Sequence, residues 1–215
     1  MSQGLDQHDE ALDPRWADVR TLPRLGELVA EWLDGRIGSA PFYGGAPDPE
    51  TESITPVLQQ LNRSGFVTDF SQPGEIDGED AQRAAVSGYC QQDVAERLAS
   101  TSVRGDLIVI SSPAGVDGCF QLPITRTHNC TFTILCGDHA PLSADDESWP
   151  WSGLHPEMRA ALLNAWFVSV LDPVWGRNDV LWPALIDATS SPVDDVRGSL
   201  IDPDYLESQG LASYG

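Results

Sequence analysis

The first clear pattern along the chain is a set of apolar residues at helical spacing, three or four positions apart. These residues are Leu25, Leu28, Val29, Trp32 and Leu33. With Pro23 near its start and Gly35 as a stop, the pattern predicts a helix from Leu22. Thr55 followed by a proline is typical of a helix start, because threonine can cap free amides and proline lacks an N–H to leave unpaired. A second helix is therefore expected to run from Thr55 to Gly65.

Shorter apolar runs predict the strands of a sheet. They cover residues 66–70, 82–89, 107–110, 120–126 and 129–136. The clearest is 107–110, which holds four consecutive branched residues. Pro123 is expected to place its strand at an edge of the sheet, because proline cannot donate to a central ladder. Residues 72–75 fit a type II turn with Gly74 at the position of positive φ, and the proline- and glycine-rich stretch 39–52 is expected to be a loop.

The second half of the chain adds three helices to the prediction. They are a short helix at 93–99, an apolar helix that starts at Pro156 and ends near Leu171, and a final helix at 180–186. Together the elements predict a single-domain α+β fold in which a small mixed or antiparallel sheet is flanked by helices. We expect this domain to cover residues 21–189, between a loose acidic N-terminal arm at 1–20 and an acidic C-terminal tail at 190–215.

Composition narrows the classes of protein to consider. A chain of 215 residues that is 41% hydrophobic can bury one full core. Its formal net charge of −21 comes from 33 acidic and 12 basic residues, and every basic residue is arginine. Such a charge repels nucleic acids and anionic membranes, so we expect no direct nucleic-acid binding and no membrane association. We also find no secretory leader and no apolar run long enough to span a bilayer, which predicts a cytoplasmic protein with reduced cysteines.

Three consecutive polar residues, Arg177, Asn178 and Asp179, lie between two apolar segments where burial is expected. Burying such side chains is costly unless they pair with each other or with a ligand. In a functional interpretation, Arg177 binds a carboxylate or phosphate and Asp179 acts as a base or orients the ligand. In a structural interpretation, Asn178 or Asp179 caps the final helix and Arg177 bridges to a carbonyl or an acid.

A second polar cluster is predicted where two strands meet. Its members are Asn62, Thr68, Asp69, Ser71, Gln72, Gln82 and Arg83. If the two strands pair, these residues gather at one end of the sheet, where loops carry function. Thr68 and Ser71 are three residues apart on an extended chain, so we expect them on opposite faces. The structural alternative is a polar turn after the end of a helix.

Metal binding is not expected, although four potential zinc ligands lie within twelve residues. These are His128, Cys130, Cys136 and His139. On one extended strand His128, Cys130 and Cys136 share a face, but His128 and Cys136 lie about 26 Å apart, too far for a single ion. Buried reduced cysteines that alternate with Phe132 and Ile134 are the favoured interpretation, and a nucleophilic Cys130 aided by His128 is the alternative. The small-residue loop 111–115 is either a ligand position or an ordinary turn.

Several motifs are absent from the sequence. We find no phosphate-binding loop, dinucleotide glycine pattern, nucleophile elbow or zinc-protease motif, which argues against the common nucleotide-binding and hydrolase families and predicts no cofactor. Residues 58–74 read LQQLNRSGFVTDFSQPG, residues 82–88 read QRAAVSG, and residues 171–185 read LDPVWGRNDVLWPAL. With LGELVAEWLDGRIGSAPFYGG at 25–45, they resemble a family of uncharacterised proteins of streptomycetes, related actinobacteria and their phages. The resemblance implies no activity, but it favours the two polar clusters as parts of one site.

The leading hypothesis is a small-molecule binding protein or small enzyme that acts on an anionic carboxylate or phosphate metabolite. Arg83 and Arg177 would share a pocket and bind the anion, with Asp179 as the catalytic residue. The residues that would orient the substrate are Asn178, Gln82, Ser71 and Gln72. The alternative hypothesis is an acidic interaction protein, of the immunity, anti-defence or DNA-mimic type, that neutralises a basic protein partner.

Overall fold

The computed structural model describes residues 12–114, 116, 120–128, 130–136 and 149–190, without the side chains of 103–105 and 136. The first eleven residues of the predicted arm and residues 191–215 of the predicted tail lie outside this part. The described end of the arm contains a short helix whose Trp16 is buried, with its indole N–H donating to the Ser39 carbonyl at 3.0 Å. Trp16 therefore anchors this segment to the domain.

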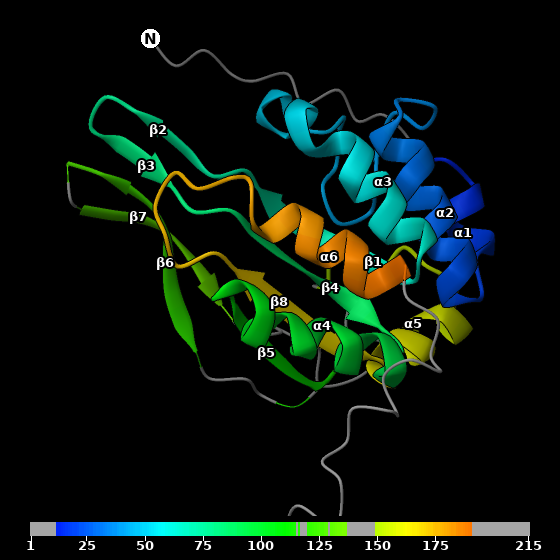
Figure 1. Cartoon of the computed structure of the whole chain (residues 1–215). Helices are drawn as coiled ribbons and strands as arrows, with labels where there is room; N and C mark the ends of the chain where they lie inside the picture. The colour runs from blue at the N-terminus through cyan, green and yellow to red at the C-terminus, as the bar shows by residue number, and fades with distance from the viewer. Residues whose placement is uncertain (1–11, 115, 117–119, 129, 137–148, 191–215) are drawn as a thin grey trace, which may run out of the picture.

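Helices and strands alternate irregularly along the chain (Figure 1). The helices are α1 (Arg15–Asp18), α2 (Leu22–Leu33), the 3₁₀ helix η1 (Pro49–Ile54), α3 (Thr55–Arg63), α4 (Gln92–Gly105), α5 (Pro156–Leu163) and α6 (Leu181–Ser190). The strands are β1 (Phe66–Gln72), β2 (Glu75–Asp77), β3 (Asp80–Gln82), β4 (Ala85–Cys90), β5 (Ile108–Pro113), β6 (Gln121–Thr127), β7 (Cys130–Cys136) and β8 (Trp166–Leu171). Every pairing between these strands is antiparallel, which confirms the predicted α+β class with antiparallel sheets.

The strands form two four-stranded sheets, which are joined by one long antiparallel ribbon. The pair β1 and β4 forms one end of this ribbon and the pair β2 and β3 forms the other. The first sheet has the order β1-β4-β8-β5 and the second has the order β2-β3-β6-β7. Strands β2 and β3 continue β1 and β4 beyond a short break at Pro73–Gly74 and Arg83–Ala84. The ribbon therefore passes from one sheet into the other, and its hairpin end projects away from helices α1 and α2 (Figure 1).

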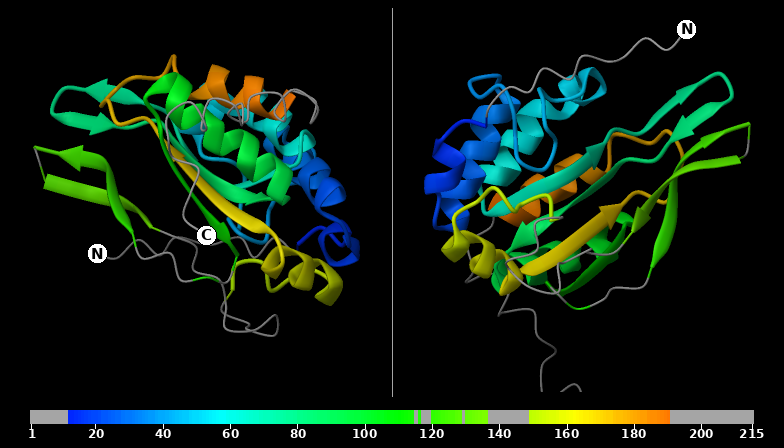
Figure 2. Two further views of the ribbon diagram at one scale, coloured as in Figure 1. Left: turned by 60° about the horizontal axis from the view of Figure 1, so that its bottom comes forward. Right: turned by 180° about the vertical axis from the view of Figure 1, so that it is seen from behind.

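The main core lies between the first sheet and its helices. Figure 2 shows α4 and α6 on the same face of this sheet, where Leu98 and Leu185 are fully buried with Val86 and Val168. Helices α2 and α3 pack against each other and against β1. A smaller apolar cluster of Ala85, Ile124, Leu135 and Leu171 lies apart from this core and joins the two sheets.

The predicted N-terminal helices are confirmed, with one change in how α3 begins. Helix α2 starts at Leu22 and α3 starts at Thr55, as the spacing and the proline positions indicate. The Thr55 hydroxyl does not cap α3, because it donates to the Thr51 carbonyl of the preceding turn at 3.1 Å. That turn is η1, whose own start is capped by the Asp48 carboxylate.

The predicted apolar helix from Pro156 to Leu171 is wrong. Helix α5 ends at Leu163, and the chain continues as β8, which pairs with β4 on one side and β5 on the other. From Phe167 onward every β8 side chain is buried, because helices cover one face and aromatic residues and the smaller cluster cover the other. A strand buried on both faces is a continuous apolar run, which periodicity cannot distinguish from a buried helix.

Two smaller predictions about the sheet are also wrong. Pro123 lies in β6, between β3 and β7, where it is tolerated because β3 pairs with β6 only as far as Thr125. Gly74 does not have the positive φ of a type II turn. A side chain at Gly74 would instead collide with the Arg177 carbonyl, so this glycine allows two backbone segments to approach closely.

Candidate functional site

A pocket of about 150 Å³ lies between helix α2, the segment 42–51 and strand β1. Its walls are formed by Trp32, Leu33, Phe42, Tyr43, Asp48, Glu50, Thr51, Leu58, Thr68, Asp69, Phe70 and Ser71. Leu33, Leu58 and Thr68 are buried, whereas Asp48 and Glu50 are exposed. The pocket therefore has a mostly apolar interior and an acidic rim.

A β-bulge in β1 shapes one wall of the pocket. Thr68 pairs with Gly88 and Phe70 pairs with Ser87, so Asp69 is an extra residue in the strand. The extra residue changes which face the following side chains point to. Thr68 and Ser71 consequently line the same pocket, and the prediction that they lie on opposite faces is wrong.

Asn62 fixes the start of this wall from the end of α3. Its side chain is completely buried, and its amide N–H groups donate to the Leu58 carbonyl and the Thr68 hydroxyl, both at 2.8 Å. Its carbonyl oxygen accepts from the Thr68 backbone N–H at 3.0 Å. Asn62 therefore holds Thr68 in place and has no side-chain N–H left for a ligand.

Aromatic rings form the opposite side of the pocket. Trp32 contacts Phe42 edge-on with a centroid distance of 5.2 Å, and it contacts Tyr43 at 5.7 Å. The Trp32 indole N–H donates to the Gly45 carbonyl at 2.6 Å, which ties the 42–45 segment to helix α2. Phe42 also packs on the buried Trp151 with a centroid distance of 4.6 Å. These contacts fix the positions of the rings before any ligand arrives.

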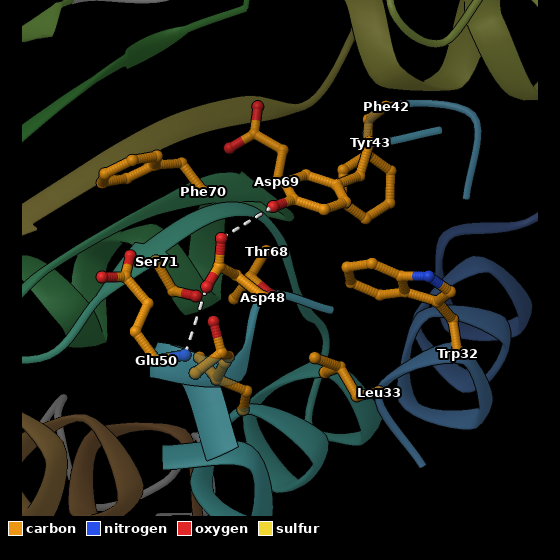
Figure 3. A pocket seen from close by; sticks show the side chains of 12 residues that line it. Trp32, Leu33, Phe42, Tyr43, Asp48, Glu50, Thr68, Asp69, Phe70 and Ser71 are labelled. Carbon is orange, nitrogen blue, oxygen red and sulfur yellow. Dashed lines mark hydrogen bonds between the residues drawn. The ribbon is translucent and has the colours of Figure 1, made fainter. Parts of the chain in front are cut away.

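Three carboxylates complete the pocket, as Figure 3 shows. Asp48 lies between the Tyr43 hydroxyl, which donates to it at 3.3 Å, and the Glu50 backbone N–H, which donates at 3.2 Å. Asp69 accepts from the Ser87 hydroxyl at 2.9 Å. Partial burial and the negative charges of Asp48 and Glu50 raise the pKa of Tyr43. The pocket is therefore lined by three carboxylates and by no arginine or histidine.

The predicted Arg177 cluster lies at the corner between the two sheets. The Arg177 Nε–H donates to the Asp172 carboxylate at 2.6 Å, and Asp172 is completely buried. This hydrogen bond raises the pKa of Arg177. The other oxygen of Asp172 accepts from the Val174 N–H at 2.9 Å. Arg177 thus holds a buried aspartate of its own chain, and Asp179 is exposed.

Two further predicted residues, Asn178 and Gln72, are also engaged inside the protein. The Asn178 carbonyl oxygen accepts from the Gly74 N–H at 2.9 Å and from the Trp182 indole N–H at 2.7 Å, instead of from the backbone of α6. The Gln72 amide donates at 3.1 Å to the carbonyls of Arg83 and Ile124, and its oxygen accepts from the Thr125 hydroxyl. Both side chains therefore hold together the break at residues 73–74 and 83–84, where the ribbon passes from the first sheet into the second. We call this region the corner between the sheets.

The structure brings some of the predicted site residues together and separates others. Both Arg83 and Arg177 interact with the charge of Asp172. The hydrogen bond to Asp172 raises the pKa of Arg177, whereas at Arg83 burial and the charge of Arg126 outweigh Asp172 and the pKa is lowered. Neither arginine lines the pocket, and of the seven predicted site residues only Ser71 does so. Gln82 reaches the rim indirectly, because its amide N–H donates to Glu50 at 3.2 Å. The shared pocket for Arg83 and Arg177 stays a prediction.

Sequence reasoning missed most of the pocket. Phe42, Tyr43, Asp48 and Glu50 fall in the stretch 39–52, which the prolines and glycines mark as a loop, and Trp32 fits a core position of its helix. The available signal was an aromatic pair followed by acidic residues within a loop, because loops carry function more often than cores do.

The cysteine prediction is wrong for Cys130, which is exposed on β7 together with Phe132. Its neighbour His128 pairs with Glu79 at the surface. Among the described residues no three His, Cys, Asp or Glu side chains are placed to hold a metal ion; His139 and the Cys136 side chain lie outside them. In the same part of the chain, no helix is long and apolar enough to cross a membrane.

Comparison with protein-family models gives one match over the domain. Residues 11–191 match the model of a domain of unknown function, DUF6919. A search of curated proteins found no match. The match covers most of the chain, including every residue of the pocket and of the corner between the sheets.

Proposed function

The chain belongs to this family, and we propose that it is a binding protein for a small organic cation, which occupies the aromatic and acidic pocket. One observation carries the proposal. The residues that line the pocket include four aromatic side chains and three carboxylates but no arginine or histidine. A cation is the ligand class that both kinds of side chain attract.

The chemistry of the walls favours an organic cation with alkyl or planar groups. Aromatic faces attract a cation through their quadrupole, by about 0.5–2 kcal/mol depending on how far the cation is desolvated. The exposed Asp48 and Glu50 add electrostatic attraction at the entrance. The cavity of about 150 Å³ is small, and an apolar cavity of such a volume accommodates a molecule the size of benzene. Methylated ammonium and guanidinium groups fit these limits.

This proposal differs from the anionic ligand that the sequence favours. An anion in the pocket would meet the charges of Asp48, Glu50 and Asp69 without a basic residue among the lining side chains. The alternative hypothesis, an acidic protein that binds a basic partner, agrees with the pocket in the sign of the charge. A partner's lysine or arginine side chain presents the same chemistry as a free cation.

Isothermal titration calorimetry tests the proposal, with tetramethylammonium chloride as the probe and sodium acetate as the comparison at equal ionic strength. We expect saturable binding of tetramethylammonium only. Tyr43→Leu removes an aromatic face and is expected to weaken binding about two- to fivefold, whereas Tyr43→Phe keeps the face and the affinity.

Glu50→Gln tests the contribution of the carboxylates. It is expected to weaken binding about fivefold, because one unit charge near the cation is lost. Glu96→Gln is the matched control, since Glu96 is exposed on α4 and contacts Gln92. Binding of acetate in place of the cation, or equal effects of the two glutamine substitutions, would contradict the proposal. Binding of an arginine-containing peptide at much higher affinity than tetramethylammonium would favour the basic-partner alternative.

A further inference from the structure

The described arginines of this acidic chain differ in whether they form an ion pair with a carboxylate. Most described arginines form ion pairs with carboxylates, as expected where acidic residues outnumber basic ones 33 to 12. These are Arg15, Arg20, Arg24, Arg36, Arg63, Arg97 and Arg177. Arg83 and Arg126 differ, because no carboxylate of the described residues lies within ion-pair distance of either guanidinium group.

The same two arginines meet on one tryptophan. The Arg83 guanidinium carbon lies 4.1 Å from the ring centre of Trp175, and that of Arg126 lies 4.5 Å from it. Arg126 pairs with Ala81 across the second sheet, and Arg83 is two residues beyond Ala81 on the same extended segment. Both side chains therefore rise from one face of the sheet toward Trp175.

The positive charges of Arg83 and Arg126 lie close together, and neither guanidinium group forms an ion pair with a described carboxylate. Burial and the neighbouring charge of Arg126 lower the pKa of Arg83. Arg83 donates one N–H to the Pro123 carbonyl at 2.9 Å, but its Nε–H is buried without a partner. The indole of Trp175, whose face attracts both cations, and the charge of Asp172, which acts on Arg83, offset part of the repulsion between the two guanidinium groups. An anion that contacts both groups would offset the rest.

We propose that Arg83 and Arg126, beside Trp175, form a binding site for a dianionic phosphate group. Both guanidinium carbons lie within 4.5 Å of the same ring centre, which places them less than about 9 Å apart. A tetrahedral phosphate beside the ring can accept hydrogen bonds from both planar guanidinium groups at such a separation, and its charge of −2 matches theirs. The site is separate from the cation pocket, which neither arginine lines.

Arg126 takes the place in this site that the sequence assigns to Arg177. Arg177 is held by the buried Asp172, so its charge is already compensated. Arg126 also lines a hollow of about 360 Å³ beside the β2–β3 hairpin, which gives it access to solvent. Glu79 in this hollow is paired with His128, whereas Asp80 has no such ion pair among the described residues. Asp80 is therefore expected to oppose phosphate binding, and Asp80→Asn to strengthen it.

The test is a calorimetric titration of the full chain with inorganic phosphate at constant ionic strength, with acetate as the comparison anion. We expect saturable phosphate binding that weakens at least fivefold in Arg83→Gln and in Arg126→Gln. Arg36→Gln is the matched control, because Arg36 is exposed and paired with Asp34, and it is expected to bind phosphate normally. Glu50→Gln is also expected to bind phosphate normally, which separates this site from the cation pocket.

Arg126→Lys keeps the charge without the planar fork, so we expect an intermediate affinity. Thermal unfolding of each variant shows whether a loss of phosphate affinity is due to misfolding. If Arg126→Gln does not fold, the affinity of Arg126→Lys is compared with that of the wild type instead. The proposal is overturned if the wild-type protein binds phosphate no better than acetate. It is also overturned if Arg36→Gln and Arg126→Gln lose affinity to the same extent.

Discussion

Asn62→Ala is the substitution outside the proposed ligand contacts that should do most harm to the pocket. Asn62 is completely buried and makes three hydrogen bonds, two donated to Leu58 and Thr68 and one accepted from the Thr68 N–H. At about 1 kcal/mol for each bond, the free energy of unfolding falls by about 3 kcal/mol. For a domain of this length, each kcal/mol corresponds to about 2–4 °C, so we expect the Tm to fall by about 6–12 °C.

Thermal unfolding followed by circular dichroism measures this effect, and Asn164→Ala supplies the control. Asn164 is exposed at the end of α5, where its side chain makes one hydrogen bond to the Ala160 carbonyl. Its removal is expected to change stability by less than about 0.5 kcal/mol. If the two variants unfold at the same temperature, Asn62 does not hold the pocket wall as described. The same Asn62 variant should also bind tetramethylammonium more weakly, because Thr68 loses its support.

Further predictions concern the corner between the sheets and the cysteines. Gly74→Ala is expected to lower the Tm, since its new methyl group would collide with the Arg177 carbonyl, whereas Gly45→Ala has no atom within 4 Å and should leave the Tm unchanged. Iodoacetamide at pH 8 is expected to label the exposed Cys130 and spare Cys90, because burial raises the pKa of Cys90 from 9.0 to about 12. Peptide mass spectrometry distinguishes the two, and rapid labelling of native Cys90 would refute its burial. The unfolded chain releases the Cys90 proton above about pH 9 while the folded chain keeps it, so stability should fall as the pH rises from 9 to 12. Denaturant unfolding at several pH values measures this fall in the free energy of unfolding. Cys90→Ala should reduce the fall, and a fall as large as that of the wild type would contradict the raised pKa of Cys90.

The elements that the sequence predicts correctly are those whose two ends are marked. Helix α2 has apolar residues at regular spacing, a proline in its first turn and Gly35 just after its end. The β6–β7 hairpin was also visible as two short runs around a polar turn. Strand β8 has no such marks. Both of its faces are covered, so its side chains do not show the alternation of polar and apolar residues that identifies a strand.

The site was harder to predict because its geometry depends on contacts between distant segments. Because Asp69 is an extra residue in β1, the side chain of Ser71 points to the opposite face from the one that regular alternation predicts. No local sequence pattern predicts this bulge. The sequence marks Arg177 as a buried charge that needs a partner, but its partner Asp172 lies five residues earlier, directly after strand β8, for which the apolar run predicts a helix. The anionic-ligand hypothesis followed from that gap.

The most direct test of the cation pocket is a ¹H–¹⁵N NMR titration of the wild-type protein with tetramethylammonium chloride, observed at the indole N–H signals. The Trp32 indole lies in the pocket wall and donates to Gly45, whereas the Trp182 indole donates to Asn178 at the corner between the sheets. Trp32→Phe assigns the first signal. We expect the Trp32 signal to move saturably and the Trp182 signal to stay in place. A Trp32 signal that stays in place, or one that moves equally with sodium acetate, would contradict a cation site in this pocket.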